Sequence, residues 1–123
     1  MDDSGEWTNE VRLVGRISVD AQEKELPSGD RVAQLRVVVP RSAPTGAGRV
    51  DTIDVACWSA RTRRSARGLK AQDTVEVVGA LRRRFFRTGT VTVSRYEVEA
   101  LSLKRTRTAT RTATRTPRST RAR

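Results

Sequence analysis

Residues 73–86, DTVEVVGALRRRFF, decide the fold class. Val75, Val77 and Leu81 share one parity, which is the alternation of a half-buried β-strand and not the spacing of a helix. Gly79 interrupts that apolar series and predicts a bend in the strand. The stretch therefore predicts a long strand that bends once and ends in an arginine-rich segment.

A hairpin and a second long strand follow this stretch. Arg87-Thr88-Gly89-Thr90 is typical of a hairpin turn, and residues 90–103 form the next alternating run. The apolar residues of this run change parity, which predicts a β-bulge near Ser94 if all of them face the core. The two groups are Val91 with Val93, and Tyr96 with Val98 and Ala100.

Three more alternating runs precede the decisive stretch, at residues 9–19, 33–39 and 51–58. Gly15 interrupts the first run and predicts a bulge or sharp bend, and residues 26–30 (LPSGD) are a strong turn signal. Val38 and Val78 fall on the outer faces of their strands. The residues expected to face inward are Val11, Leu13, Ile17 and Val19, then Ala33, Leu35, Val37 and Val39, then Ile53, Val55 and Cys57.

One short helix is predicted between the third and fourth runs. Alternation stops over residues 59–70, Ser59 is a good N-cap, and the helix is expected to end near Gly68 with Leu69 as its anchor. The element order is then β-β-β-α-β-β. With two mid-strand glycines and one bulge to bend the sheet, this order predicts an all-β, five-stranded oligonucleotide-binding (OB) barrel.

Charge divides the 123 residues into three parts. The chain carries 25 Lys and Arg against 14 Asp and Glu, a formal net charge of +11. Eight of those cations and no acid lie in residues 104–123, so residues 1–103 carry only +3. We expect an acidic leader at 1–8, a folded domain at 9–103 and a disordered basic tail at 104–123. The excess of cations makes a polyanion the first partner to consider.

The composition excludes most enzyme classes. There is no histidine and a single cysteine, Cys57, which rules out His-dependent triads, Cys/His zinc sites and an intramolecular disulfide. Cys57 is expected to be a small buried hydrophobe. The closest carboxylate pair, Glu97 and Glu99, predicts cross-strand ion pairs with arginines, and a metal-dependent nuclease at that pair is a remote alternative. We expect no enzyme, no metal and no cofactor, and a cytoplasmic protein without a membrane span.

Arginines interleaved with aromatic rings predict a surface for single-stranded nucleic acid. Trp58 and Phe86 have outward parity, where bases can stack on exposed rings, and a subunit interface is the alternative. Phe85 has inward parity and is expected in the core, with stacking as its alternative. Tyr96 is left open between core and stacking, and Trp7 is assigned no role. The candidate phosphate contacts are Arg36, Arg41, Arg82, Arg83, Arg84 and Arg87.

Four segments in register resemble the bacterial single-stranded DNA-binding protein (SSB) family: 9–16 (NEVRLVGR), 26–29 (LPSG), 54–58 (DVACW) and 75–82 (VEVVGALR). The resemblance covers residues 9–103. It implies an OB barrel, assembled as a homotetramer, that coats single-stranded DNA in replication, recombination and repair. It also implies stacking roles for Trp58 and Phe86, with phosphate contacts from the arginines nearby.

Two departures from that family shape the expectation. An aromatic residue common in the loop after the second strand is replaced by Ser42-Ala43-Pro44. The sequence ends in Thr120-Arg121-Ala122-Arg123, where the family has an acidic, aromatic-tipped peptide that recruits repair and replication enzymes. We therefore expect a secondary paralogue of the short actinobacterial type, without recruitment through that peptide. The open alternatives are an RNA-binding OB module and a primosome-type OB interaction protein.

Overall fold

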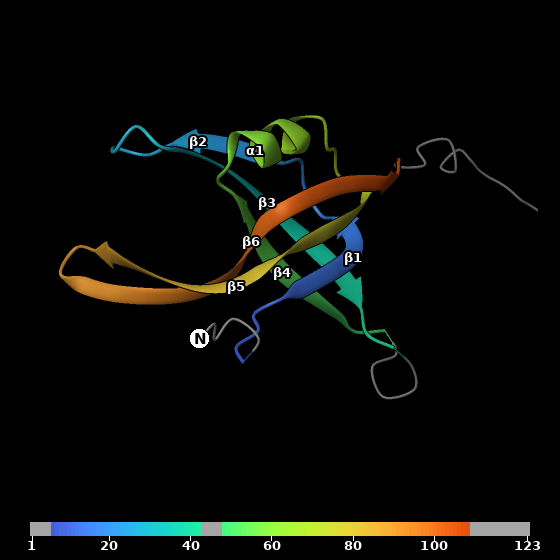
Figure 1. Ribbon diagram of the computed structural model, residues 1–123, viewed down its shortest axis with the longest axis horizontal. Helices are drawn as coiled ribbons and strands as arrows, with labels where there is room; N and C mark the ends of the chain where they lie inside the picture. The colour runs from blue at the N-terminus through green and yellow to red at the C-terminus, as the bar shows by residue number, and fades with distance from the viewer. Residues whose placement is uncertain (1–5, 43–47, 109–123) are drawn as a thin grey trace, which may run out of the picture.

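Six strands and one helix make up the part of the chain that the computed structural model describes, residues 6–42 and 48–108 (Figure 1). The expected acidic leader lies partly outside this range, as do residues 43–47 in the loop after the second predicted strand and the basic tail from 109 onward. The elements in chain order are β1 (Val11–Ile17), β2 (Gln22–Glu25), β3 (Arg31–Pro40), β4 (Val50–Cys57), α1 (Ala60–Arg67), β5 (Thr74–Thr88) and β6 (Val91–Arg107).

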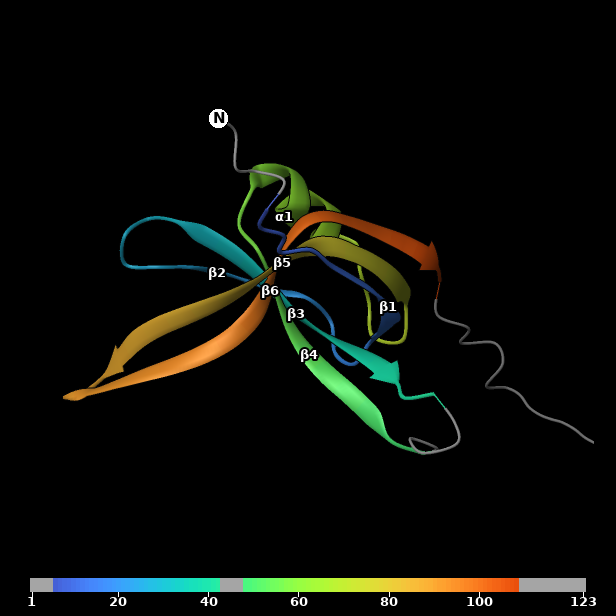
Figure 2. The same ribbon diagram turned by 60° about the horizontal axis from the view of Figure 1, so that its bottom comes forward.

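The strands form one sheet in the order β1-β5-β6-β4-β3-β2, and an additional β1–β3 pairing closes five of them into a ring. All neighbours are antiparallel except β4 and β6, which pair in parallel at Val55 and Val98. The predicted all-β, five-stranded OB barrel with its helix between the third and fourth long strands is confirmed. Two long hairpins, β2–β3 and β5–β6, extend beyond the ring on the same side (Figures 1 and 2).

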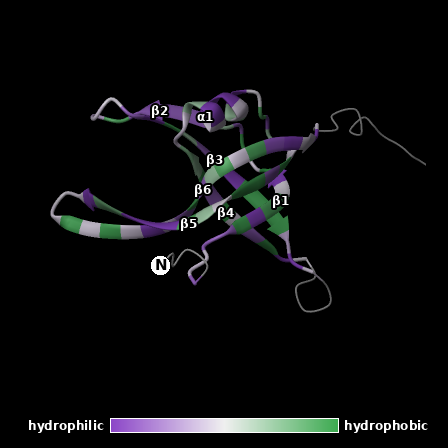
Figure 3. Cartoon of the chain, viewed as in Figure 1, coloured by the Kyte–Doolittle hydropathy of each residue, from purple (hydrophilic) through white to green (hydrophobic). Residues whose placement is uncertain are grey.

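The short strand β2 was not predicted. Its sequence, QEKE, has no apolar residue and all four residues are exposed, so it carries no alternation signal (Figure 3). β2 forms because the chain reverses at the expected turn and pairs with β3 from Gln22–Gln34 to Glu25–Arg31. In that turn the Leu26 amide donates to the Asp30 carbonyl at 2.8 Å, and Gly29 takes a positive φ of 94°.

β1 pairs with two neighbouring strands, and this double pairing explains its central glycine. It pairs with β5 up to Arg16 and with β3 at Arg16 and Ile17. A Cβ on Gly15 would collide with the Val38 carbonyl oxygen, so Gly15 permits the close crossing of β1 over β3 without a bulge. This crossing covers Val38, so its predicted exposure is wrong. Val19 lies past the end of β1 and is exposed, so its predicted inward position is also wrong.

The bulges of the β5–β6 pair lie elsewhere than expected. β5 and β6 pair without a shift from the turn to Gly79–Ala100, so the bulge predicted near Ser94 is wrong. The register shifts instead between Val78 and Gly79, which confirms the bend predicted at that glycine. Val91 and Val93 are exposed because the outer half of the hairpin has left the barrel. The inward position predicted for Leu81 fails for the same reason, since Leu81 lies where β5 departs.

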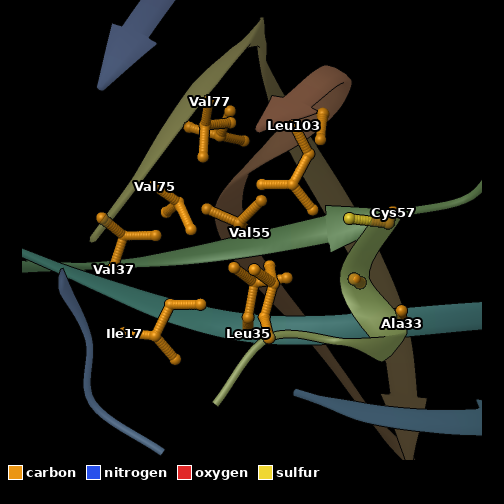
Figure 4. Close-up of a cluster of buried hydrophobic side chains, with 13 residues drawn as sticks. Ile17, Ala33, Leu35, Val37, Val55, Cys57, Val75, Val77 and Leu103 are labelled. Carbon is orange, nitrogen blue, oxygen red and sulfur yellow. The ribbon is translucent and has the colours of Figure 1, made fainter. Parts of the chain in front are cut away.

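The core lies inside the ring and under α1 (Figure 4). Ser59 caps α1 by accepting a hydrogen bond from the Thr62 amide at 3.1 Å, α1 ends at Gly68, and Leu69 is buried, as predicted. Cys57 is fully buried, and this burial raises the pKa of its thiol to about 11. The predicted role of Cys57 as a buried apolar residue is therefore confirmed. No helix in the described residues is long and apolar enough to span a membrane.

β6 continues to Arg107, four residues into the segment predicted as tail. Its last residues pair with the start of β5. Arg105 donates from Nη1 to the buried carboxylate of Asp73 at 3.4 Å. Asp73 also accepts from the Lys70 amide at 2.9 Å. This end of the strand is held by backbone pairing and an ion pair, which composition alone does not reveal.

Candidate nucleic-acid interface

A groove of about 360 Å³ separates the two projecting hairpins. Residues of β2, β3 and the turn between β2 and β3 form one wall, the β5–β6 hairpin forms the other, and the end of β4 forms the base. A second, more polar hollow of about 210 Å³ adjoins it along β3 and β4 and shares Gln34, Arg95 and Glu97 with it. The groove is lined by Lys24, Leu26, Val32, Gln34, Trp58, Arg84, Phe85, Phe86, Arg95 and Glu97.

Trp58 follows β4 at the base of the groove, where a guanidinium group covers its ring. The Arg84 carbon Cζ lies 4.3 Å from the ring centroid, and Arg84 also ion-pairs with Glu97. The indole Nε1 is buried and meets no hydrogen-bond acceptor among the described residues. Trp58 is therefore half-buried and presents the groove with a stacked pair of indole and guanidinium, where parity predicted an exposed ring.

Phe86 lies further out on β5, with 40% of its surface exposed, as its parity predicted. Arg95 of β6 places its guanidinium carbon 5.4 Å from the Phe86 ring centroid. Three aromatic rings thus line the groove, since Phe85 also borders it, and each ring lies beside an arginine. This arrangement suits nucleobases, whose flat faces stack on aromatic rings and guanidinium planes.

Phe85 is 63% exposed, so the prediction of a core position for it is wrong. The strand has already left the barrel at this point, and inward parity no longer leads into the core. Tyr96 is 59% exposed, which settles its position outside the core as well. Both rings flank Arg83, whose Cζ lies 4.9 Å from the Phe85 centroid and 5.5 Å from the Tyr96 centroid.

Acidic residues pair with two of the three arginines on the groove side of the hairpin, and Arg95 has no carboxylate partner among the described residues. Arg82 pairs with Glu99 at 2.9 Å, and Arg84 pairs with Glu97, so each arginine bonds the acid diagonally across the hairpin. The predicted cross-strand ion pairs at Glu97 and Glu99 are confirmed. Across residues 6–42 and 48–108, no three Asp, Glu or Cys side chains gather to hold a metal ion.

Two further predicted site arginines lie on the outer face of β3 and just beyond its end. Arg36 pairs with Asp54 at 3.1 Å and borders the polar hollow, whereas Arg41 pairs with Asp51 at 2.9 Å. The hydrogen bonds that Arg41 donates to Asp51 raise the pKa of the Arg41 guanidinium. Arg87, near the hairpin tip, is exposed and has no carboxylate partner among the described residues.

The structure adds groove residues that the sequence did not single out, above all Arg95 and Lys24. Arg95 lies directly opposite Arg84 in the β5–β6 register, so counting back from the hairpin turn would have found it. Lys24 and Gln34 lie on the β2–β3 hairpin, and no apolar pattern marks β2. Lys24 and Gln34 complete the wall that faces the aromatic rings, whereas Arg95 lies beside Phe86 on the β5–β6 hairpin.

Comparison with known proteins gives one family and one fold. The model of the single-strand binding protein family matches residues 8–106, most of the chain. A solved structure described as the Plasmodium falciparum SSB complex with ssDNA superposes with a TM-score of 0.67 at 18% sequence identity. The match covers 85% of this chain and 98% of that one, and it shows the same fold. No curated protein sequence matches the chain significantly.

Proposed function

Because the chain belongs to the single-strand binding protein family, we propose that it binds single-stranded DNA in the groove between the β2–β3 and β5–β6 hairpins. Members of this family are non-catalytic DNA-binding proteins, so the chain is not an enzyme. The observation that carries the proposal is the pairing of Trp58 with Arg84 and of Phe86 with Arg95 along one groove.

In this proposal the bases enter the groove and stack, each contributing about 1–3 kcal/mol. One base packs on Phe86, and another packs against the Arg84 guanidinium, which the Trp58 ring supports from behind. Arg36 and Arg41 continue the path along β3, since both keep about half of their side-chain surface exposed despite their ion pairs. Every base has a π-face, so such contacts bind without sequence preference.

Fluorescence of Trp58 tests the proposal directly. Trp7→Phe leaves Trp58 as the only tryptophan, because the chain has two. Titration with oligo-dT is expected to quench its emission, and a matched duplex is expected to quench it far less. No quenching together with no mobility shift at low salt would contradict DNA binding. Oligo-U in competition separates the RNA-binding alternative, because stacking and phosphate contacts alone do not distinguish the two strands.

The biological setting is proposed from the family resemblance. We expect a cytoplasmic, nucleoid-associated protein that coats single strands during replication, recombination or repair and assembles as a homotetramer. Native mass spectrometry with and without oligo-dT tests the assembly. A dimer whose mass changes only with a protein partner would favour the primosome-type alternative.

A further inference from the structure

The β5–β6 hairpin has a second face that does not line the groove with its arginines. Side chains alternate along each strand, so Arg83 and Arg87 point away from the side that carries Arg82 and Arg84. Register pairs confirm the division: Arg83 lies opposite Tyr96, and Arg87 lies opposite Thr92. We call the side that carries Arg83, Phe85, Arg87, Thr92, Ser94 and Tyr96 the reverse face. Phe85 is the member of this face that also borders the groove.

Charge on the reverse face is unbalanced. The acids of the hairpin, Glu97 and Glu99, both bond arginines of the groove face. Within the described residues no carboxylate comes within ion-pairing distance of Arg83 or Arg87. The reverse face therefore keeps two uncompensated positive charges on an exposed, protruding element (Figures 1 and 2).

Arg83 makes ring and hydroxyl contacts and has no acidic partner among the described residues. Its guanidinium lies by the rings of Phe85 and Tyr96, and its Nη2 donates to the Ser94 hydroxyl at 3.2 Å. Contacts of this kind engage the flat faces of a guanidinium and leave the remaining N–H donors at its edge free. A planar fork of free donors matches the oxygens of a phosphate group.

We propose that the reverse face is a second contact surface for the same single strand, with Arg83 and Arg87 binding backbone phosphates after the strand has passed from the groove around the hairpin. This inference rests on the proposed binding of single-stranded DNA. A second copy of this chain is a poor occupant, because the chain carries a net charge of +11 and the reverse face offers no acid to attract it. A polyanion complements it.

The test compares a short strand, which fills the groove, with a long one. Arg83→Gln with Arg87→Gln removes both reverse-face charges, and Arg61→Gln with Arg64→Gln on α1 is a control with the same change in net charge. With oligo-dT of about 8 nucleotides, within the usual site size of one barrel, the affinity should stay within roughly twofold. With about 30 nucleotides the salt slope should fall by about 1.4, a loss of roughly 10- to 30-fold near 0.1 M salt.

Each other outcome overturns a distinct claim. An equal loss on both lengths would place Arg83 and Arg87 in the groove, and an unchanged slope would show that the reverse face does not contact the strand. An equal loss in the α1 control would show that affinity falls with the net charge of the protein and does not depend on the position of Arg83 and Arg87. A changed oligomer mass in the reverse-face variant would make this face a protein interface. If the unaltered protein binds neither oligonucleotide, the proposed function itself fails.

Discussion

On the groove face of the β5–β6 hairpin, Arg82 and Arg84 are ion-paired to Glu99 and Glu97, whereas on the reverse face Arg83 and Arg87 have no such partner among the described residues. Both faces carry aromatic rings and arginines. The difference lies in two glutamates, which pair with two of the three arginines of the groove face and hold Arg84 against an aromatic ring, so that Arg95 alone keeps an unpaired charge there among the described residues. The comparison teaches that the alternation of side chains can divide an arginine-rich hairpin into two faces. On one face most arginines are ion-paired, and on the other they keep their charge.

The largest expected effect comes from Gly79→Ala. The bulge between Val78 and Gly79 is where the hairpin leaves the barrel, and it decides which side chains fall on which face. A Cβ at Gly79 would collide with the Glu99 carbonyl oxygen, which is backbone and cannot turn aside. We expect a loss of about 3 kcal/mol in the free energy of unfolding, measured by urea denaturation.

Gly68→Ala is the matched control for that substitution. A Cβ at Gly68 meets no atom within 4 Å, and Gly68 does not take a positive φ. We expect a change of less than about 0.5 kcal/mol. Equal losses at both glycines would mean that the collision with Glu99 has no special cost and that the bulge tolerates a side chain.

Phe86→Ala against Phe85→Ala separates the two faces by their rings. Both rings border the groove, but Phe86 lies beside Arg95 of the groove face, whereas Phe85 belongs by parity to the reverse face and contacts Arg83. With a short oligo-dT, Phe86→Ala should cost about 2 kcal/mol, roughly 30-fold in Kd, because one stacked base is lost. Phe85→Ala should cost no more than about threefold. A larger loss at Phe85 would show that a base stacks on Phe85 in preference to Phe86, where the groove meets the reverse face.

Glu97→Gln makes the groove face resemble the reverse face. The amide keeps an oxygen that can accept from Arg84 but removes the negative charge. With a short oligo-dT, we expect the salt slope to rise by about 0.7 and the affinity to rise about fivefold near 0.1 M salt. The Glu97 side chain is buried at 9% exposure, but Arg84 is 40% exposed and keeps water as a partner, so a thermal melt should show a loss of about 1 kcal/mol. A fall in affinity would instead make Glu97 essential for positioning Arg84.

Sequence alone predicts the barrel but not the point at which its strands leave it. Alternation identifies the long strands because one face of each is buried along most of its length, as at Val75 and Val77. Leu81 and Phe85 share the parity of the core residues across the hairpin, yet both are exposed. Parity reports which side of the sheet a residue occupies, and burial depends on whether another element covers that side.

The candidate site was also predictable only in part. Local pairing within one hairpin made the ion pairs of Glu97 and Glu99 predictable, because register follows from the turn. The stacking of Arg84 on Trp58 was not predictable, since it joins the end of β4 to a distant part of β5. Side-chain partners across a barrel depend on its closure and on strand tilt, which no single segment specifies.

The smallest expected effect concerns the opposite wall of the groove, where Glu23 of β2 bonds Arg67 of α1 at 3.1 Å. That hydrogen bond lowers the pKa of Glu23 below its ordinary value of 4.5. A carboxylate with a lowered folded-state pKa stabilises the fold above about pH 4.5 and loses this contribution as the pH falls through the lower value. Glu23→Gln should therefore lower the urea midpoint slightly near pH 7, and the two proteins should converge once the pH has fallen below the lowered pKa of Glu23. Glu23 bonds the helix and does not line the groove, so oligo-dT affinity should change less than twofold. A larger change would mean that the anchoring of β2 to α1 sets the width of the groove, and that both walls, and not the β5–β6 hairpin alone, determine how the strand is held.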